Sequence, residues 1–153
     1  MGESVMTEQH HTRTQGGFVV TPEEGRLLPS FGQVKISGRD TGGGFEVIEF
    51  RGNAASPPPH VHHEREECIH VLEGRFTFTL DHEEIEAVPG SWVFVPRGTR
   101  HGFTASPDAR ALILVTPAGL EDFFAELGEG LAAGTPTHEL RARLKGRFDS
   151  VPA

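Results

Sequence analysis

Short runs of apolar residues, separated by Gly and Pro, follow one another along most of the chain and predict β-strands. From Phe18 onward these runs are rich in Val, Ile, Phe and Thr, the residue types that favour strands, while Gly and Pro mark turns. The pattern predicts strands at residues 33–37, 44–50, 67–72, 75–80, 83–88, 91–95, 101–105 and 111–116. Since so many short strands need their edges covered, we expect an all-β fold, a closed or sandwiched antiparallel barrel.

The last quarter of the chain changes from the strand period to the helix period. Apolar residues recur at helical spacing after Thr116-Pro117, and a second short stripe follows Thr135-Pro136; the residues concerned are Leu120, Phe123, Phe124, Leu127, Leu131, Leu140 and Leu144. We interpret both stripes as helix faces that pack against the barrel. The predicted organisation is a flexible tail at 1–16, a barrel at 17–118, C-terminal helices at 119–147 and a tail at 148–153.

Composition and charge narrow the classes of partner. The 153 residues suit one domain, and the net charge of -8 comes from 22 acidic against 14 basic residues. Without a basic cluster, the chain has no electrostatic match to nucleic acid or to anionic lipid. No run approaches 18 apolar residues, and the first residues lack the apolar centre of a secretory signal. We therefore expect a cytoplasmic protein that binds neither nucleic acid nor membrane.

The segment PPPHVHHEREECIHVLEG, residues 57–74, carries the first candidate chemistry. In an extended chain His60 and His62 project from one face, about 7 Å apart, so that two imidazoles can approach one ion. Glu67 lies five residues beyond His62, so the chain must turn within the charged residues 63–66 before Glu67 can face the histidines. His63, Cys68 and His70 then point to the other face, where surface, interface or packing roles are expected.

The segment GSWVFVPRGTRHGF, residues 90–103, predicts a strand, a turn at Pro96 and Gly98, and a returning strand that begins with His101. A third imidazole is thereby available. Three imidazoles and one carboxylate, with no thiolate, suit a divalent transition metal such as iron, manganese, nickel, cobalt or zinc. Four protein ligands leave coordination positions for water, substrate or dioxygen.

The two segments resemble the paired signatures of the cupin superfamily, Gly-x5-His-x-His-x3,4-Glu-x6-Gly and Gly-x5-Pro-x-Gly-x2-His-x3-Asn. His60, His62, Glu67 and Gly74 match the first signature; the second is matched by Gly90, Pro96, Gly98 and His101. The resemblance implies a cupin barrel, or jelly roll, in which His60, His62, Glu67 and His101 hold the metal. Two positions depart from the signatures: the first glycine is at 52, with Ala54 in its place, and Ala105 replaces the final asparagine.

A narrower resemblance implies an activity. PPPHVHH, the VLEG turn and TPAGLEDFFAELG are similar to small bacterial quercetin-dioxygenase-like cupins. Such enzymes open a flavonol ring with dioxygen at an iron, manganese, nickel or copper centre. For this chain the resemblance implies iron or manganese first, a small hydroxylated or dicarbonyl substrate, and Glu67 as the catalytic base. Similar cupins often pair, so a homodimer is expected.

Other functions stay open at this point. One is a metal-dependent isomerase or epimerase of a sugar, which would use proton transfer by a carboxylate because the only lysines, Lys35 and Lys145, lie outside both signatures. Another is a non-enzymatic barrel that binds or senses a small molecule. The inward-facing Phe76, Phe78 and Phe103 either line an aromatic substrate pocket or simply fill the barrel.

Overall fold

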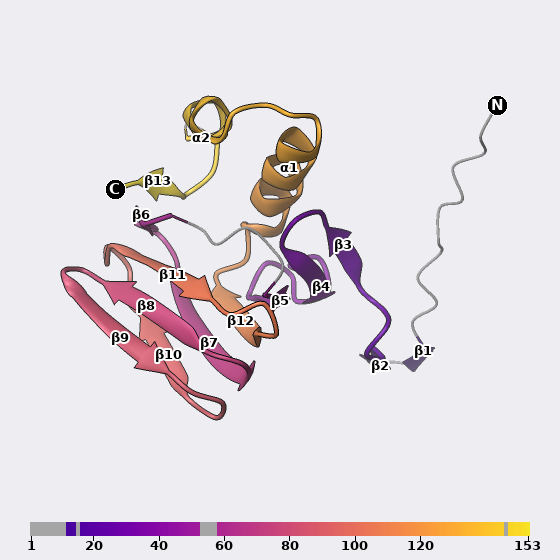
Figure 1. Cartoon of the computed structure of the whole chain (residues 1–153). Helices are drawn as coiled ribbons and strands as arrows, with labels where there is room; N and C mark the ends of the chain where they lie inside the picture. The colour runs from indigo at the N-terminus through magenta and orange to yellow at the C-terminus, as the bar shows by residue number, and fades with distance from the viewer. Residues whose placement is uncertain (1–11, 15, 53–57, 146) are drawn as a thin grey trace.

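The described residues form a series of strands, then two helices and a last short strand, as Figure 1 shows. The computed structural model describes residues 12–14, 16–52, 58–145 and 147–153. The strands are β1 (Thr12–Thr14), β2 (Gly17–Val19), β3 (Arg26–Leu28), β4 (Gly32–Ile36), β5 (Glu46–Arg51), β6 (His60–Val61), β7 (Glu66–Glu73), β8 (Phe76–Leu80), β9 (Glu83–Ala87), β10 (Trp92–Val95), β11 (His101–Ala105), β12 (Arg110–Thr116) and β13 (Val151–Pro152). The helices are α1 (Glu121–Ala132) and α2 (Thr137–Leu144).

Two antiparallel sheets form the barrel. One has the strand order β10-β7-β12-β5-β4-β3 and the other β13-β6-β11-β8-β9, while β1 pairs with β2 alone. Each strand predicted from the sequence is present, with ends displaced by at most two residues. The predicted all-β jelly-roll fold with C-terminal helices is confirmed.

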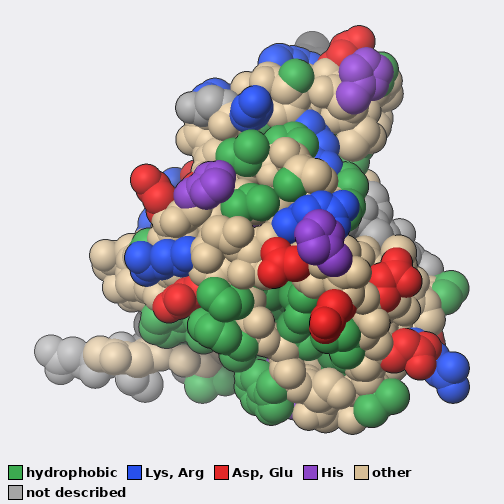
Figure 2. Space-filling model, turned by 90° about the vertical axis from the view of Figure 1, so that its left-hand side faces the viewer, with side chains coloured by type: hydrophobic (Ala, Val, Ile, Leu, Met, Phe, Trp, Pro, Cys, Tyr) green, Lys and Arg blue, Asp and Glu red, His purple; other side chains and the backbone are tan. Residues whose placement is uncertain are grey.

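Alternation along the strands directs apolar side chains inward. On β7, Glu67, Ile69 and Val71 are buried, while the residues between them are only half-buried. His70 lies on the outer face, where its ring stacks on Trp92 with centroids 4.0 Å apart, and His63 is exposed. The outer face of the barrel is not wholly polar: Trp92 is 68% exposed, and Figure 2 shows hydrophobic side chains among acidic ones on the lower, barrel part of one face.

A cluster of phenylalanines fills the interior between the sheets. Phe50 comes from one sheet, and Phe76, Phe78 and Phe103 come from the other. Ring centroids are 4.9 Å apart for Phe50 and Phe103 and 5.5 Å apart for Phe78 and Phe103, and all four side chains are buried. Edge-on and offset contacts of this kind are the favourable arrangement of aromatic rings.

The helices cover one end of the barrel (Figure 1). On α1, Phe124 stacks on Phe31 from the loop between β3 and β4, with centroids 4.3 Å apart, and α2 buries Leu140 and Leu144. The first helix begins at Glu121, some residues after Thr116-Pro117. Across the described residues, neither helix has the length and apolar composition needed to cross a bilayer.

Both predicted tails contain paired strands. Val151 pairs with Val61 and Pro152 with His60, so β13 forms the edge of a sheet instead of belonging to a tail over residues 148–153. The backbone N–H of Ala153 also donates to the carbonyl of Pro59, over 3.1 Å. Within the predicted tail at 1–16, β1 pairs with β2; residues 1–11 and 15 lie outside the described residues.

Candidate metal centre

Four side chains, on three strands or directly after one of them, meet at one point inside the barrel. His60 lies on β6, His62 follows that strand, Glu67 lies on β7 and His101 begins β11, where it pairs directly opposite His60. One nitrogen or oxygen of each side chain lies within 4.8 Å of the corresponding atom of every other, and all four residues are buried. The structure thus brings together all four ligand residues predicted from the sequence.

Backbone carbonyls orient the three imidazoles. In every ring Nδ1 lies within hydrogen-bond distance of a carbonyl oxygen: His60 with Pro58 (2.8 Å), His101 with Thr99 (2.9 Å) and His62 with Asp149. Because Nδ1 donates to the carbonyl, the neutral ring keeps the lone pair of Nε2 for the centre of the cluster. This is the arrangement that supports histidine ligands in metal proteins.

Glu67 faces two of these nitrogens. Its Oε1 lies 3.1 Å from Nε2 of His62, and its Oε2 lies 3.3 Å from Nε2 of His101. Burial opposes ionisation of Glu67, but the hydrogen bonds and charges of His101 and His62 hold its pKa well below the usual range. The carboxylate is therefore ionised, as a metal ligand must be.

The pKa values of His60 and His62 shift in opposite directions. Burial, followed by the neighbouring His101 and His62, lowers the pKa of His60 to about 3, so its ring is neutral at physiological pH. Burial also disfavours the charged form of His62, but the hydrogen bond and negative charge of Glu67 outweigh it and raise the pKa of His62. The neutral forms of these rings are the ones that bind metals.

The donor set fits a divalent transition metal. Nε2 of His101 is buried without a well-aligned hydrogen-bond partner, a state that is costly unless something else engages that lone pair. Donor atoms on one ion, each about 2.1 Å from it, lie roughly 3–4.2 Å apart, which is close to the separations found here. Nitrogen and carboxylate oxygen suit iron, manganese, nickel, cobalt or zinc without selecting one.

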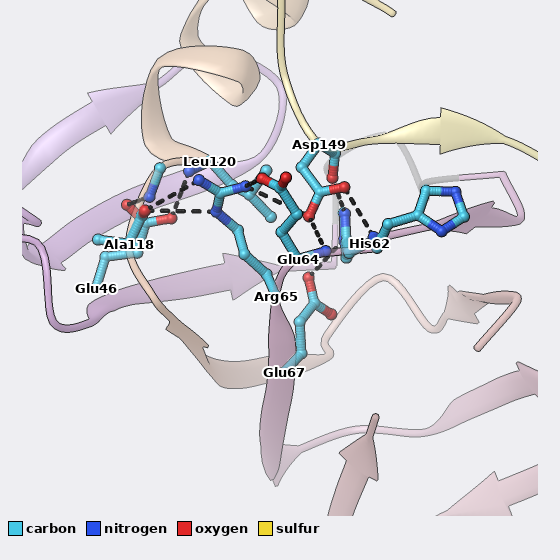
Figure 3. Close-up of polar contacts among 10 residues, drawn as sticks. Glu46, His62, Glu64, Arg65, Glu67, Ala118, Leu120 and Asp149 are labelled. Carbon is cyan, nitrogen blue, oxygen red and sulfur yellow. Dashed lines mark hydrogen bonds and ion pairs between the residues drawn. The ribbon is translucent and has the colours of Figure 1, made fainter. Parts of the chain in front are cut away.

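Asp149, from the segment after α2, supports the site and was not predicted from the sequence. Its carboxylate accepts hydrogen bonds from the backbone N–H groups of His63 (2.7 Å) and Glu64 (2.8 Å) and pairs with Arg65 (3.3 Å), as Figure 3 shows in part. These contacts hold the turn that lets Glu67 face the histidines. Nothing in the sequence links residue 149 to this turn, because the two lie more than 80 residues apart.

The glycines of the two signatures hold backbones close together. The N–H of Gly98 donates to the carbonyl of His62 over 2.7 Å, which connects the second segment to the first. A Cβ at Gly52 would lie 2.1 Å from the carbonyl oxygen of Ser106, so only glycine fits there. The close backbone contact therefore explains the glycine at position 52, whereas Ala54 lies outside the described residues.

An apolar cavity adjoins the cluster at His60. It has a volume of about 270 Å3 and lies between the barrel and the helices; Phe31, Phe123, Phe124, Leu127, Leu131 and Arg141 are among the residues that line it. Phe76, Phe78 and Phe103 are absent from its lining and pack instead in the phenylalanine cluster. The helical stripe, interpreted from the sequence as a packing face only, thus also lines this cavity.

Comparison with known proteins agrees with the fold and the site. The cupin domain family matches residues 46–117, which include all four residues of the cluster. These matched residues are a cupin domain. Over 87 residues this cupin is 33% identical to quercetin 2,3-dioxygenase of Bacillus subtilis, an alignment that covers 56% of the chain and 26% of that enzyme.

Further similarities cover parts of other proteins. An uncharacterized protein of Methanocaldococcus jannaschii is 40% identical over 42 residues, 28% of this chain and 34% of that protein. The cupin thus spans about a quarter to a third of the length of these two relatives. Among solved structures, KdgF from Halomonas sp. has 25% identity (57% of this chain, 77% of that chain, TM-score 0.49), and the polyketide cyclase RemF from Streptomyces resistomycificus has 32% (60% and 69%, TM-score 0.48).

Proposed function

We propose that this cupin binds one divalent transition metal, iron or manganese first, and acts as a dioxygenase on a small hydroxylated or dicarbonyl compound of flavonol-like character. The observation that carries the proposal is the buried cluster of three imidazoles and one carboxylate beside an apolar cavity. The 33% identity with a quercetin 2,3-dioxygenase over 87 residues supports the same chemistry.

Each residue of the cluster has a role in this proposal. His60, His62, His101 and Glu67 would hold the metal, which when bound would lower the pKa of a substrate hydroxyl and provide the site for dioxygen. Glu67 is ionised and can accept the hydroxyl proton. The carbonyls behind the three Nδ1 atoms hold the rings in place, while the apolar lining of the cavity excludes water from the substrate.

The cavity favours a ring compound over a sugar. A polyol carries hydroxyl groups along its whole length, and each would lose hydrogen bonds to water in a cavity lined by side chains such as those of Phe31, Phe123 and Leu127. An aromatic substrate with few hydroxyl or carbonyl groups loses few hydrogen bonds to water. This argues against the isomerase or epimerase alternative; the sensing alternative is decided by the following experiment.

Oxygen uptake by the metal-loaded protein tests the proposal. The chain would be loaded anaerobically with Fe(II) or Mn(II), analysed for bound metal and mixed with flavonols, diketones and catechols in an oxygen electrode. We expect one metal per chain and uptake with at least one compound class. Glu67→Gln keeps an oxygen ligand but cannot accept a proton, so uptake at equal metal content should fall about 100-fold.

Glu66→Gln is the matched control, because Glu66 precedes Glu67 on β7 but is only half-buried and lies outside the cluster. It should retain both metal and uptake. Metal binding without uptake from any compound would contradict the dioxygenase, and ligand binding without turnover would favour the sensor. The homodimer, the cytoplasmic location, and the absence of nucleic-acid and membrane partners stay predictions.

A further inference from the structure

Arg141 on α2 is a half-buried cation without a counterion. It lines the cavity beside His60, and its guanidinium has no hydrogen bond or ion pair with any residue that the structure describes. Burial lowers its pKa. Arg147, by contrast, is exposed and still pairs with both carboxylate oxygens of Glu126, at 2.6 and 2.7 Å. A cation removed from water without a partner is unfavourable, so an anionic group on Arg141 would offset that cost.

The rest of the cavity suits a flat apolar body. Phe31 and Phe124 stack with an interplanar angle of 16°, and Phe123 meets Phe124 edge-on. All three rings line the cavity. A cavity of about 150 Å3 is enough to hold benzene. The volume of about 270 Å3 therefore accommodates an aromatic compound of one or two rings.

The charge of α2 and its C-cap residue is opposite in sign to that of the whole protein. The chain carries a net charge of -8, which repels anions. Residues 137–145, however, contain three basic residues, Arg141, Arg143 and Lys145, against the single acidic Glu139. In Figure 2 basic side chains lie beside hydrophobic ones in the upper, helical part, and most acidic side chains lie lower. The charge of α2 itself thus favours an anion at Arg141.

We propose that the cavity binds a small aromatic carboxylate, with its ring among Phe31, Phe123 and Phe124 and its carboxylate paired with Arg141. Guanidinium and carboxylate match as two parallel hydrogen bonds, which is the strongest form of such a pair. Since His60 lines the same cavity, the bound compound also lies beside the metal ligands. The assignment of this carboxylate as the substrate rests on the proposed function; its binding does not.

Equilibrium binding measurements separate the contribution of the ligand's carboxylate from that of its aromatic ring. The full chain, loaded with Zn(II) so that no turnover occurs, would be titrated calorimetrically with 2-naphthoate and with the uncharged 2-naphthamide at physiological ionic strength. We expect 2-naphthoate to bind at least ten-fold more tightly. Arg141→Gln should weaken the binding of 2-naphthoate about 10- to 100-fold and leave the affinity for 2-naphthamide within about two-fold of its original value.

Two further variants locate the ligand. Arg143→Gln removes the same charge from an exposed position of α2 and should leave both affinities within about two-fold. Leu131→Trp fills the cavity and should weaken the binding of both ligands at least about ten-fold. Circular dichroism would check that this variant keeps its fold. Equal losses in Arg143→Gln and Arg141→Gln, or no loss in Arg141→Gln, would overturn the site.

The result also separates this site from the proposed activity. Arg141-dependent binding of 2-naphthoate without oxygen uptake from any compound would support the carboxylate site and contradict the dioxygenase. Oxygen uptake with uncharged flavonols that is unchanged in Arg141→Gln, together with no preference for 2-naphthoate, would support the dioxygenase and overturn the carboxylate site.

Discussion

Two ends of the same barrel interior have opposite chemistry, and β11 contributes to both. His101 and Phe103 lie two residues apart on this strand and both point inward. Opposite Phe103 lies Phe78, in the phenylalanine cluster, whereas His101 lies opposite His60, in the polar cluster. The phenylalanines stabilise the fold simply by leaving water. The ionisable side chains gain nothing comparable, so their burial calls for another reason.

The hydrogen bonds of the polar cluster show what that reason is. Each imidazole is satisfied at Nδ1 by a backbone carbonyl, while the Nε2 atoms gather around one carboxylate. For Nε2 of His101 no well-aligned partner is present among the described residues. A protein interior rarely leaves such atoms without a partner unless a ligand uses them. The phenylalanine cluster therefore holds the barrel together, whereas the barrel holds the polar cluster in place.

Truncation of the phenylalanine cluster should have the largest effect. Phe76→Ala removes a buried ring that contacts Phe50, Phe78 and Phe103, and should lower the free energy of unfolding by about 3–5 kcal/mol. Urea unfolding of the metal-free protein measures this change, and elemental analysis of the folded variant should still find one metal. Lost metal with unchanged stability would contradict the division between the two regions.

Removal of a metal-binding side chain should affect metal affinity strongly and stability only slightly. His101→Ala should weaken metal binding by more than about 100-fold, since even supporting residues contribute 10- to 100-fold, while metal-free stability falls less than in Phe76→Ala. Competition with a chelator measures the affinity. His70→Ala is the control, because His70 stacks on Trp92 outside the barrel and should not affect metal. Equal affinities of the two variants would refute the ligand assignment.

The metal-free protein should lose stability as the pH falls from about 6.5 to about 4.5. His60 has a folded pKa of about 3 against an ordinary 6.5, so in this window the unfolded chain takes up the proton and the folded chain does not. The contribution of His62, whose folded pKa is raised, is constant below 6.5, and that of Glu67, whose folded pKa is depressed, is lost only below about 4.5.

The expected loss is about 2 kcal/mol, measured by urea unfolding at successive pH values. His60→Gln should flatten the profile in this window, because the titrating group is gone. A profile that is equally steep in His60→Gln would assign the pH dependence to other groups.

Loss of the Asp149 carboxylate should have the smallest effect. Asp149→Ala keeps the backbone carbonyl behind His62 but releases the turn at His63 and Glu64, so metal affinity should fall about ten-fold. Asp122→Ala is the control, because that carboxylate pairs with Arg26 on the surface. An unchanged affinity in Asp149→Ala would show that the turn holds its shape without the carboxylate.

Local patterns in the sequence predicted most of the barrel and the members of the polar cluster. Alternation along residues 66–73 identified the inward side of β7, and the resemblance of two segments to the cupin signatures implied that His60, His62, Glu67 and His101 meet. Such predictions succeed because strand parity and short turns depend on neighbouring residues only. The two-residue strands β6 and β13 were not predicted, because they are too short to show an alternation of apolar and polar residues.

The sequence by itself thus determined the strands, the inward faces and the four residues of the cluster. Only the tertiary structure decided that Asp149 holds the turn beside His62, that β13 pairs with β6, and that α1 and α2 enclose a cavity with Arg141 on its wall. These features join residues that are distant along the chain. Their contacts depend on how the helices pack on the barrel, and no local pattern of residues encodes that packing.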